Sequence, residues 1–341
     1  MLVVGPGRHT YAMKWIVPVA LLAALAACGG GAGTLPPEAA VTTTPTRVVT
    51  VQEQQCTQAG WRSETMVVAG IARGVLWKAP AGAWARGGLV VLHGGGGQHA
   101  NFCIANAELI AAQVRFTDMA LAQGFAVFLL DSTDRVTDTE GRLCGKVWDD
   151  EVRQRDNLDL PFIEEVLRKL IPSARPAGSR TDLYLTGLSS GGYMAVRAAT
   201  HFGGHISAFA PVASGDPYGW VRDCTPRAGD RTNVFGVGLD AETRRNISEV
   251  GACAATSWPN EKPWDGSAIN PKPPFRLFHH AQDGIHDRSC VDKVRRQLVQ
   301  RGWPEAAPFM LDGGSRSAEV HYWQDAYNAP LLAWLGEQKR R

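Results

Sequence analysis

Short apolar runs alternate with stretches of helical periodicity from Glu64 to the C-terminus, and this alternation limits the folds open to the chain more than any other feature. Strands followed by helices pair in parallel, because a helical crossover returns the chain to the edge of the sheet from which it started. We therefore expect an α/β fold with a mostly parallel central sheet and helices on both faces. The apolar runs predict strands at 88–93, 125–130, 183–186, 206–212, 275–278 and 308–311, after a hairpin over 66–77, and the periodicity predicts helices over 107–123, 160–171 and 327–335.

The first 27 residues have the pattern of an export signal. Arg8 and Lys14 precede an uncharged apolar stretch at 15–27 that is too short to span a membrane. The stretch ends in Leu-Ala-Ala-Cys, which resembles the lipobox of bacterial lipoproteins, where cleavage before the cysteine is followed by lipid attachment to it. We therefore expect 1–27 to be a lipoprotein signal peptide and Cys28 to hold an exported bacterial protein at the membrane of the cell envelope. An ordinary secretory signal is the alternative.

The rest of the chain divides into a tether and one folded domain. Residues 28–50 are rich in Gly, Ala, Thr and Pro and predict a flexible tether, followed by a single domain over 51–341. Within that domain, residues 215–274 break the alternation with seven prolines, and so long a loop is usually functional. We expect this segment to form a cap or wall in which Trp220, Trp258 and Trp264 contact an apolar or aromatic ligand. Alternatively, these tryptophans bury the segment against the domain.

The cysteine count bears on disulfides and metal binding, and the charge bears on nucleic-acid binding. Six cysteines remain beyond residue 28, and an even number in an exported chain predicts up to three disulfides, with buried free thiols as the alternative. They are Cys56, Cys103, Cys144, Cys224, Cys253 and Cys290. Cys224 and Cys253 share one segment, which favours that pair. No C-x-x-C pair occurs, and we expect no metal. Lys and Arg number 35 against 33 Asp and Glu without a basic stripe, so nucleic acid is not an expected partner.

The sequence Gly-Leu-Ser-Ser-Gly-Gly at 187–192 carries the clearest chemical signal. It contains G-x-S-x-G between a predicted strand and a predicted helix, the setting in which a nucleophile elbow holds a serine in a tight, strained turn. Glycine is required at 187 and 191, because side chains there would clash with the strand or the helix. Ser189 is therefore the candidate nucleophile. A glycine-rich turn without a nucleophile is the alternative.

A serine nucleophile needs a base, and the base needs an acid that orients it. In folds with this elbow both follow the serine, acid first. Asp283 comes just after the predicted strand 275–278, with Asp287 and Asp292 as alternatives. His321 lies in the loop after the last predicted strand and is the candidate base, since His286 is too close to Asp283 in sequence to face it from another loop.

A glycine-rich loop supplies the remaining part of such a site. His-Gly-Gly-Gly-Gly at 93–97 follows the predicted strand 88–93, and glycines let backbone amides approach a developing oxyanion. We expect the amides of Gly95 and Ser190 to form this oxyanion hole. His93, His279 and His280 are expected to have structural roles at strand ends.

The sequence resembles the secreted α/β-hydrolase esterases in four segments, at 93–94, 120–127, 187–192 and 279–283. The resemblance is to the polyhydroxybutyrate depolymerase-like group, which also includes feruloyl and acetylxylan esterases, and it covers most of 60–338. It implies an α/β-hydrolase fold and a Ser-Asp-His enzyme without cofactor that acts on short-chain, hydroxyalkanoate, feruloyl or acetyl esters. Three departures bear on the substrate: H-G-G-G-G for H-G-C, His280 for a glycine, and Val-His-Tyr-Trp for Gly-His-x-Trp-Pro.

Two other functions fit the same motifs. A serine peptidase would share the triad and cleave amides, and a non-catalytic surface protein would use the scaffold for binding alone. A binding protein would usually have lost a triad position, whereas all three are occupied here, so an esterase is the favoured interpretation.

Overall fold

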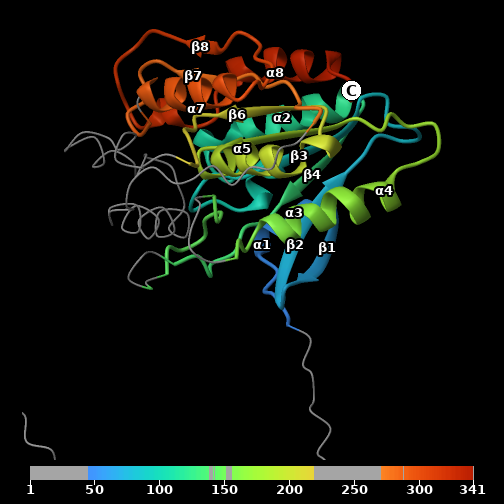
Figure 1. Ribbon diagram of the computed structural model, residues 1–341. Coiled ribbons are helices and arrows are strands. Elements are labelled where there is room, and N and C mark those ends of the chain that lie inside the picture. Colours follow the sequence, from blue (N-terminus) through green and yellow to red (C-terminus); the bar gives the residue numbers. More distant parts are fainter. Residues whose placement is uncertain are drawn as a thin grey trace, which may run out of the picture. The chain divides into compact units, whose positions relative to one another are not determined.

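The computed structural model describes residues 45–137, 141, 143–150, 156–218, 270–286 and 288–340 (Figure 1). The predicted signal peptide, Cys28 and the three tryptophans of the 215–274 segment lie outside the described residues. A compact unit begins at Pro45, so the tether that we expected to reach residue 50 ends earlier. The last residues of the predicted tether belong to the domain, because Arg47 forms an ion pair with Glu53 at 2.5 Å.

The centre of the fold is an eight-stranded sheet in the order β1-β2-β4-β3-β5-β6-β7-β8. β1 pairs with β2, and β2 with β4, in antiparallel orientation, and every other neighbouring pair is parallel. The predicted hairpin and the predicted mostly parallel sheet are therefore confirmed. The strands are β1 (Arg62–Val68), β2 (Ile71–Lys78), β3 (Gly87–Leu92), β4 (Phe125–Leu130), β5 (Leu183–Leu188), β6 (Ala208–Val212), β7 (Phe278–His280) and β8 (Phe309–Leu311).

Helices cover both faces of this sheet. Alternate residues of β3 show the division, because Val90 and Leu92 pack with side chains of α3, α5 and α7, whereas Leu89 and Val91 pack with α1, α2 and α8. Strands buried on both faces are apolar throughout, which explains the uninterrupted runs in the sequence. The helices are α1 (Val51–Gln58), α2 (Ala111–Ala122), α3 (Leu160–Glu165), α4 (Ile171–Ala174), α5 (Ser190–Phe202), α7 (Arg288–Gln300) and α8 (Asp325–Glu337), with short turns η1 (His99–Phe102), η2 (Glu108–Ile110), η3 (Val166–Leu170, π-helical), η4 (Gly203–His205) and η7 (Glu319–His321).

The strand predicted at 275–278 is wrong in its position. β7 begins only at Phe278, and Phe275 makes an isolated bridge to Phe209 of β6. The amide of Phe209 donates to the carbonyl of Pro274, and the amide of Arg276 donates to the carbonyl of Phe209. Every second residue of β6 faces this neighbour, so the next amide that should donate is that of Pro211. Proline has no N–H, which interrupts the ladder until Phe278.

Disulfides are confirmed for three of the six cysteines. Cys56 of α1 is bonded to Cys103, which follows η1, across 47 residues. Cys144 is disulfide-bonded as well, and its partner is not among the described side chains. The favoured pair Cys224–Cys253 lies outside the described residues. Within the described part of the chain, no helix combines the length and the apolar character needed to cross a membrane.

Candidate active site

Ser189 occupies the single position between β5 and α5. Its backbone has φ 53° and ψ −120°, a region that residues other than glycine rarely adopt, and its amide donates to the carbonyl of Val212 at 2.9 Å. A side chain at Gly187 would overlap the carbonyl of Gly191, and one at Gly191 would overlap the carbonyl of Leu92. The strained turn and the two glycines therefore form the elbow that the sequence predicted.

Asp283 and His321 meet at the same end of the parallel strands. Asp283 lies three residues beyond β7, and His321 is the last residue of η7. The Asp283 Oδ2 to His321 Nδ1 distance is 2.8 Å, and the two residues are 1% and 6% exposed. Of the alternative acids, Asp292 lies on α7 with its carboxylate 3.8 Å from Arg288, and Asp287 lies outside the described residues.

The surroundings keep Asp283 ionised. Burial alone would raise the pKa of its carboxyl, but the charge and hydrogen bond of His321, with smaller contributions from His286 and His279, hold the pKa below its ordinary value. Its other oxygen accepts the amides of Ile285 at 2.8 Å and His286 at 2.9 Å. A carboxylate in this position accepts the Nδ1 proton of His321 and so selects, for the neutral ring, the tautomer in which Nε2 can act as a base.

His286 also belongs to this site, which the sequence did not indicate. Its ring meets the ring of His321 edge to face, with centroids 4.7 Å apart, and it contacts Tyr193 of α5 at 5.4 Å. Its Nδ1 donates to the carbonyl of Ala213 at 2.7 Å, and burial together with His321 lowers its pKa to about 4. His286 is therefore neutral at pH 7 and packs beside His321 without competing for Asp283. The feature of the sequence that could have indicated this role is the position of His286 three residues after Asp283, whose carboxylate accepts the His286 amide.

The loop after β3 lies next to the elbow. β3 neighbours β5, and Leu92 pairs with Gly187, so the loops at their carboxyl ends are adjacent. The amides of Gly96 and Gly97 donate to the carbonyls of Lys146 at 2.7 Å and Gly94 at 3.0 Å. Across the described residues, no such acceptor is found for the amide of Gly95. Ser190 is the first residue of α5, so its amide has no intrahelical acceptor either.

The three histidines at strand ends make local contacts, as predicted. The His93 Nδ1 donates to the carbonyl of Gly94 at 2.8 Å, and its Nε2 accepts the amide of Ser132 at 3.0 Å. Burial lowers the pKa of His93, so its ring is neutral. His280 accepts a backbone amide at 3.1 Å, and His279 is buried with its Nδ1 3.7 Å from Asp283. A search of the described side chains for three or more His, Cys, Asp or Glu arranged to hold a metal finds no such group.

Comparisons with known proteins bear on the fold. No family model matches the chain, and no curated protein matches it. Among solved structures, an esterase from Pyrobaculum calidifontis is 14% identical with a TM-score of 0.50, over 84% of this chain and 91% of that one. The acylaminoacyl peptidase of Pyrococcus horikoshii is 13% identical with a TM-score of 0.50, over 82% of this chain and 42% of that one. A thermostable esterase is 14% identical with a TM-score of 0.49, and the match covers 82% of this chain but only 63% of that one.

The chain has the α/β-hydrolase fold. The strand order, in which β2 alone runs antiparallel to the other strands, agrees on this point with the likeness to the two structures that have a TM-score of 0.50. At such low identity the likeness extends to the fold alone, and the chemistry has to be argued from the residues of this chain.

Proposed function

We propose that this protein is a serine hydrolase that cleaves carboxylic esters with Ser189, His321 and Asp283. The observation that carries the proposal is the buried hydrogen bond of 2.8 Å between Asp283 and His321, at the sheet edge where Ser189 lies in its strained turn. A carboxylate bonded to Nδ1 is the arrangement that makes a histidine a general base for serine.

The reaction follows from these positions. Nε2 of His321 takes the hydroxyl proton as Ser189 attacks the ester carbonyl, and Asp283 stabilises the imidazolium that forms. The amides of Gly95 and Ser190 bind the negative oxygen of the tetrahedral intermediate. His321 then gives its proton to the leaving alcohol, and a water molecule activated by His321 hydrolyses the acyl-enzyme.

For the substrate we propose short-chain, hydroxyalkanoate, feruloyl or acetyl esters, on the strength of the resemblance to polyhydroxybutyrate depolymerase-like enzymes. Trp220, Trp258 and Trp264 are proposed to line the acyl side of the site. The motifs that carry this resemblance lie at 93–94, 120–127, 187–192 and 279–283.

Matched esters and amides test the reaction class. We expect the protein to hydrolyse p-nitrophenyl acetate, butyrate and octanoate and methyl ferulate, and to release no p-nitroaniline from p-nitroacetanilide, which has the same acyl group as the acetate. A fluorophosphonate should label Ser189, as identified by peptide mass. Cleavage of the anilide in preference to the ester would make the protein a peptidase, and the absence of both labelling and ester hydrolysis would overturn the proposal.

For location we propose an exported lipoprotein held at the cell envelope through Cys28, which the pattern of residues 1–31 supports. Cells grown with an alkyne fatty acid should incorporate it into the wild-type protein and not into Cys28→Ala. Equal labelling of the two proteins would contradict this proposal.

A further inference from the structure

Residues 146–148 contact both segments that carry the proposed oxyanion-hole amides, the loop after β3 and the start of α5. On one side, the Lys146 carbonyl accepts the amide of Gly96 at 2.7 Å, and the indole N–H of Trp148 donates to the His93 carbonyl at 2.8 Å. On the other side, the backbone amide of Trp148 donates to the Ser190 hydroxyl at 3.2 Å. This segment of three residues therefore joins the loop after β3 to the first residue of α5.

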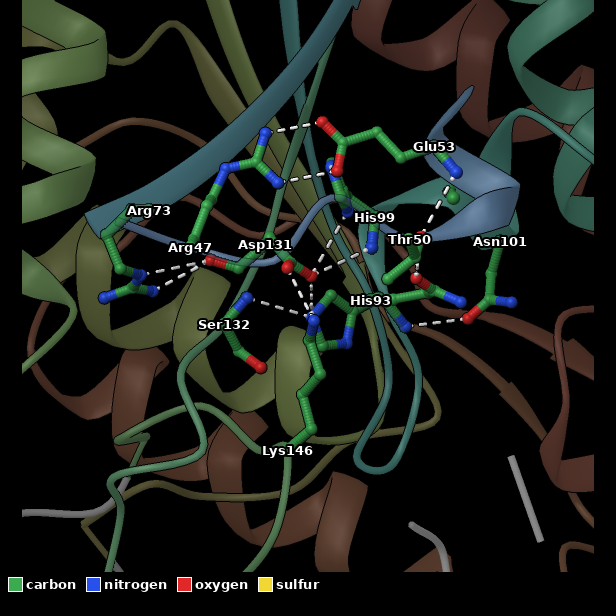
Figure 2. A network of polar contacts seen from close by, with 12 residues as sticks. Arg47, Thr50, Glu53, Arg73, His93, His99, Asn101, Asp131, Ser132 and Lys146 are labelled. Carbon is green, nitrogen blue, oxygen red and sulfur yellow. Dashed lines mark hydrogen bonds and ion pairs between the residues drawn. The ribbon is translucent and has the colours of Figure 1, made fainter. Parts of the chain in front are cut away.

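The 146–148 segment is fixed to the sheet through Asp131, the residue after β4. Figure 2 shows the Asp131 carboxylate beside the side chains of Lys146, His93 and His99. Its carboxylate lies 2.5 Å from the Lys146 ammonium and accepts the amide of His99 at 3.2 Å. Burial alone would raise the pKa of Asp131, but Lys146 and His99 hold it well below the ordinary value. The backbone amide of the neighbouring Ser132 donates to the ring of His93, so the Asp131 carboxylate and the Ser132 amide support the loop from the same end of β4.

The contacts of the loop determine where the Gly95 amide points. The carbonyl of Gly94 accepts both the His93 Nδ1 at 2.8 Å and the amide of Gly97 at 3.0 Å. In a planar trans peptide the carbonyl and the following N–H point in opposite directions. Since the Gly94 carbonyl is held within the loop, the N–H of Gly95 is directed away from it.

Trp148 is buried at the centre of these contacts. It has no exposed surface, and its ring lies 5.2 Å from that of His93. A buried indole N–H must find an acceptor, and here the acceptor is the carbonyl at the start of the oxyanion loop. A shift of this ring would therefore move the loop relative to Ser190.

We propose that residues 146–148 set the separation between the Gly95 and Ser190 amides, with Trp148 as the positioning residue and Asp131 as the anchor of the segment. This inference rests on the proposed function, because it assigns a task to the oxyanion hole. A displaced donor weakens binding of the transition state and leaves binding of the ground state almost unchanged.

Trp148→Phe tests the inference, because it keeps an aromatic ring and removes the indole N–H, and Trp84→Phe serves as its control for the loss of ring volume. We expect kcat for p-nitrophenyl butyrate to fall about 10-fold or more, with KM within about twofold of wild type. The inhibition constant of a trifluoromethyl ketone with the same acyl group, whose serine adduct carries an oxyanion, should rise by the same factor as kcat falls. A general loss of packing would not produce this match.

Controls separate the two proposals. Trp84 is equally buried but precedes β3, at the opposite edge of the sheet, so Trp84→Phe should leave kcat unchanged. Should Trp148→Phe not fold, Asp131→Asn replaces it, with Asp182→Asn as its control, since Asp182 is a buried aspartate just before β5.

Unchanged kcat and inhibitor affinity, or a rise in KM alone, would overturn the inference provided that Ser189→Ala is inactive. An active Ser189→Ala would instead refute the proposed function.

Discussion

Replacing Ser189 by alanine is expected to lower kcat for p-nitrophenyl acetate by at least about 10⁴-fold, because no other group at the elbow can form the acyl-enzyme. Alanine keeps the Cβ and adopts the same φ of 53° with the same strain, so the melting temperature should remain near that of wild type. Initial rates and the mass of the protein after fluorophosphonate treatment measure the loss of turnover and of labelling together.

Ser173→Ala provides the matched control for this substitution. Its hydroxyl lies on α4 and donates to the Leu170 carbonyl, so its loss should leave the rate unchanged. A rate for Ser189→Ala within about tenfold of wild type would exclude Ser189 as the nucleophile.

Replacing Asp283 by asparagine is expected to lower kcat by about 10⁴-fold. The Asp283 Oδ1 accepts the amides of Ile285 and His286, and the asparagine oxygen can keep these bonds. Its NH₂ group would then face Nδ1 of His321 and donate to it, which places the ring proton on Nε2. A histidine in that tautomer cannot accept the serine proton. The neutral asparagine also lacks the negative charge with which Asp283 stabilises the imidazolium.

The comparison with Asp292→Asn makes this prediction specific. Asp292 was one of the two alternative acids in the sequence, with Asp287, and it lies on α7 beside Arg288. Its substitution should change kcat by less than about twofold, as for an exposed ion pair. Steady-state rates and the second-order rate of fluorophosphonate labelling should fall together for Asp283→Asn, and equal losses in both variants would contradict the assignment.

Local patterns predicted the secondary structure well where an element is buried on both faces. The runs at 88–93 and 125–130 correspond to β3 and β4 within one residue, because a central parallel strand is apolar along its whole length. The prediction failed at 275–278, where the ladder depends on Pro211 in a neighbouring strand. It also failed at the end of the tether, where Arg47 is held by Glu53.

By itself, the sequence determined the α/β class and named Ser189, Asp283 and His321 as candidates, because turns, glycines and strand ends are encoded within a few residues. The tertiary structure alone decided that Asp283, and not Asp292, meets His321, that His286 packs against that ring, and that Trp148 joins His93 to Ser190. These contacts link residues about 35 to 55 positions apart, and their geometry follows from how neighbouring strands and helices pack rather than from any periodicity along the chain.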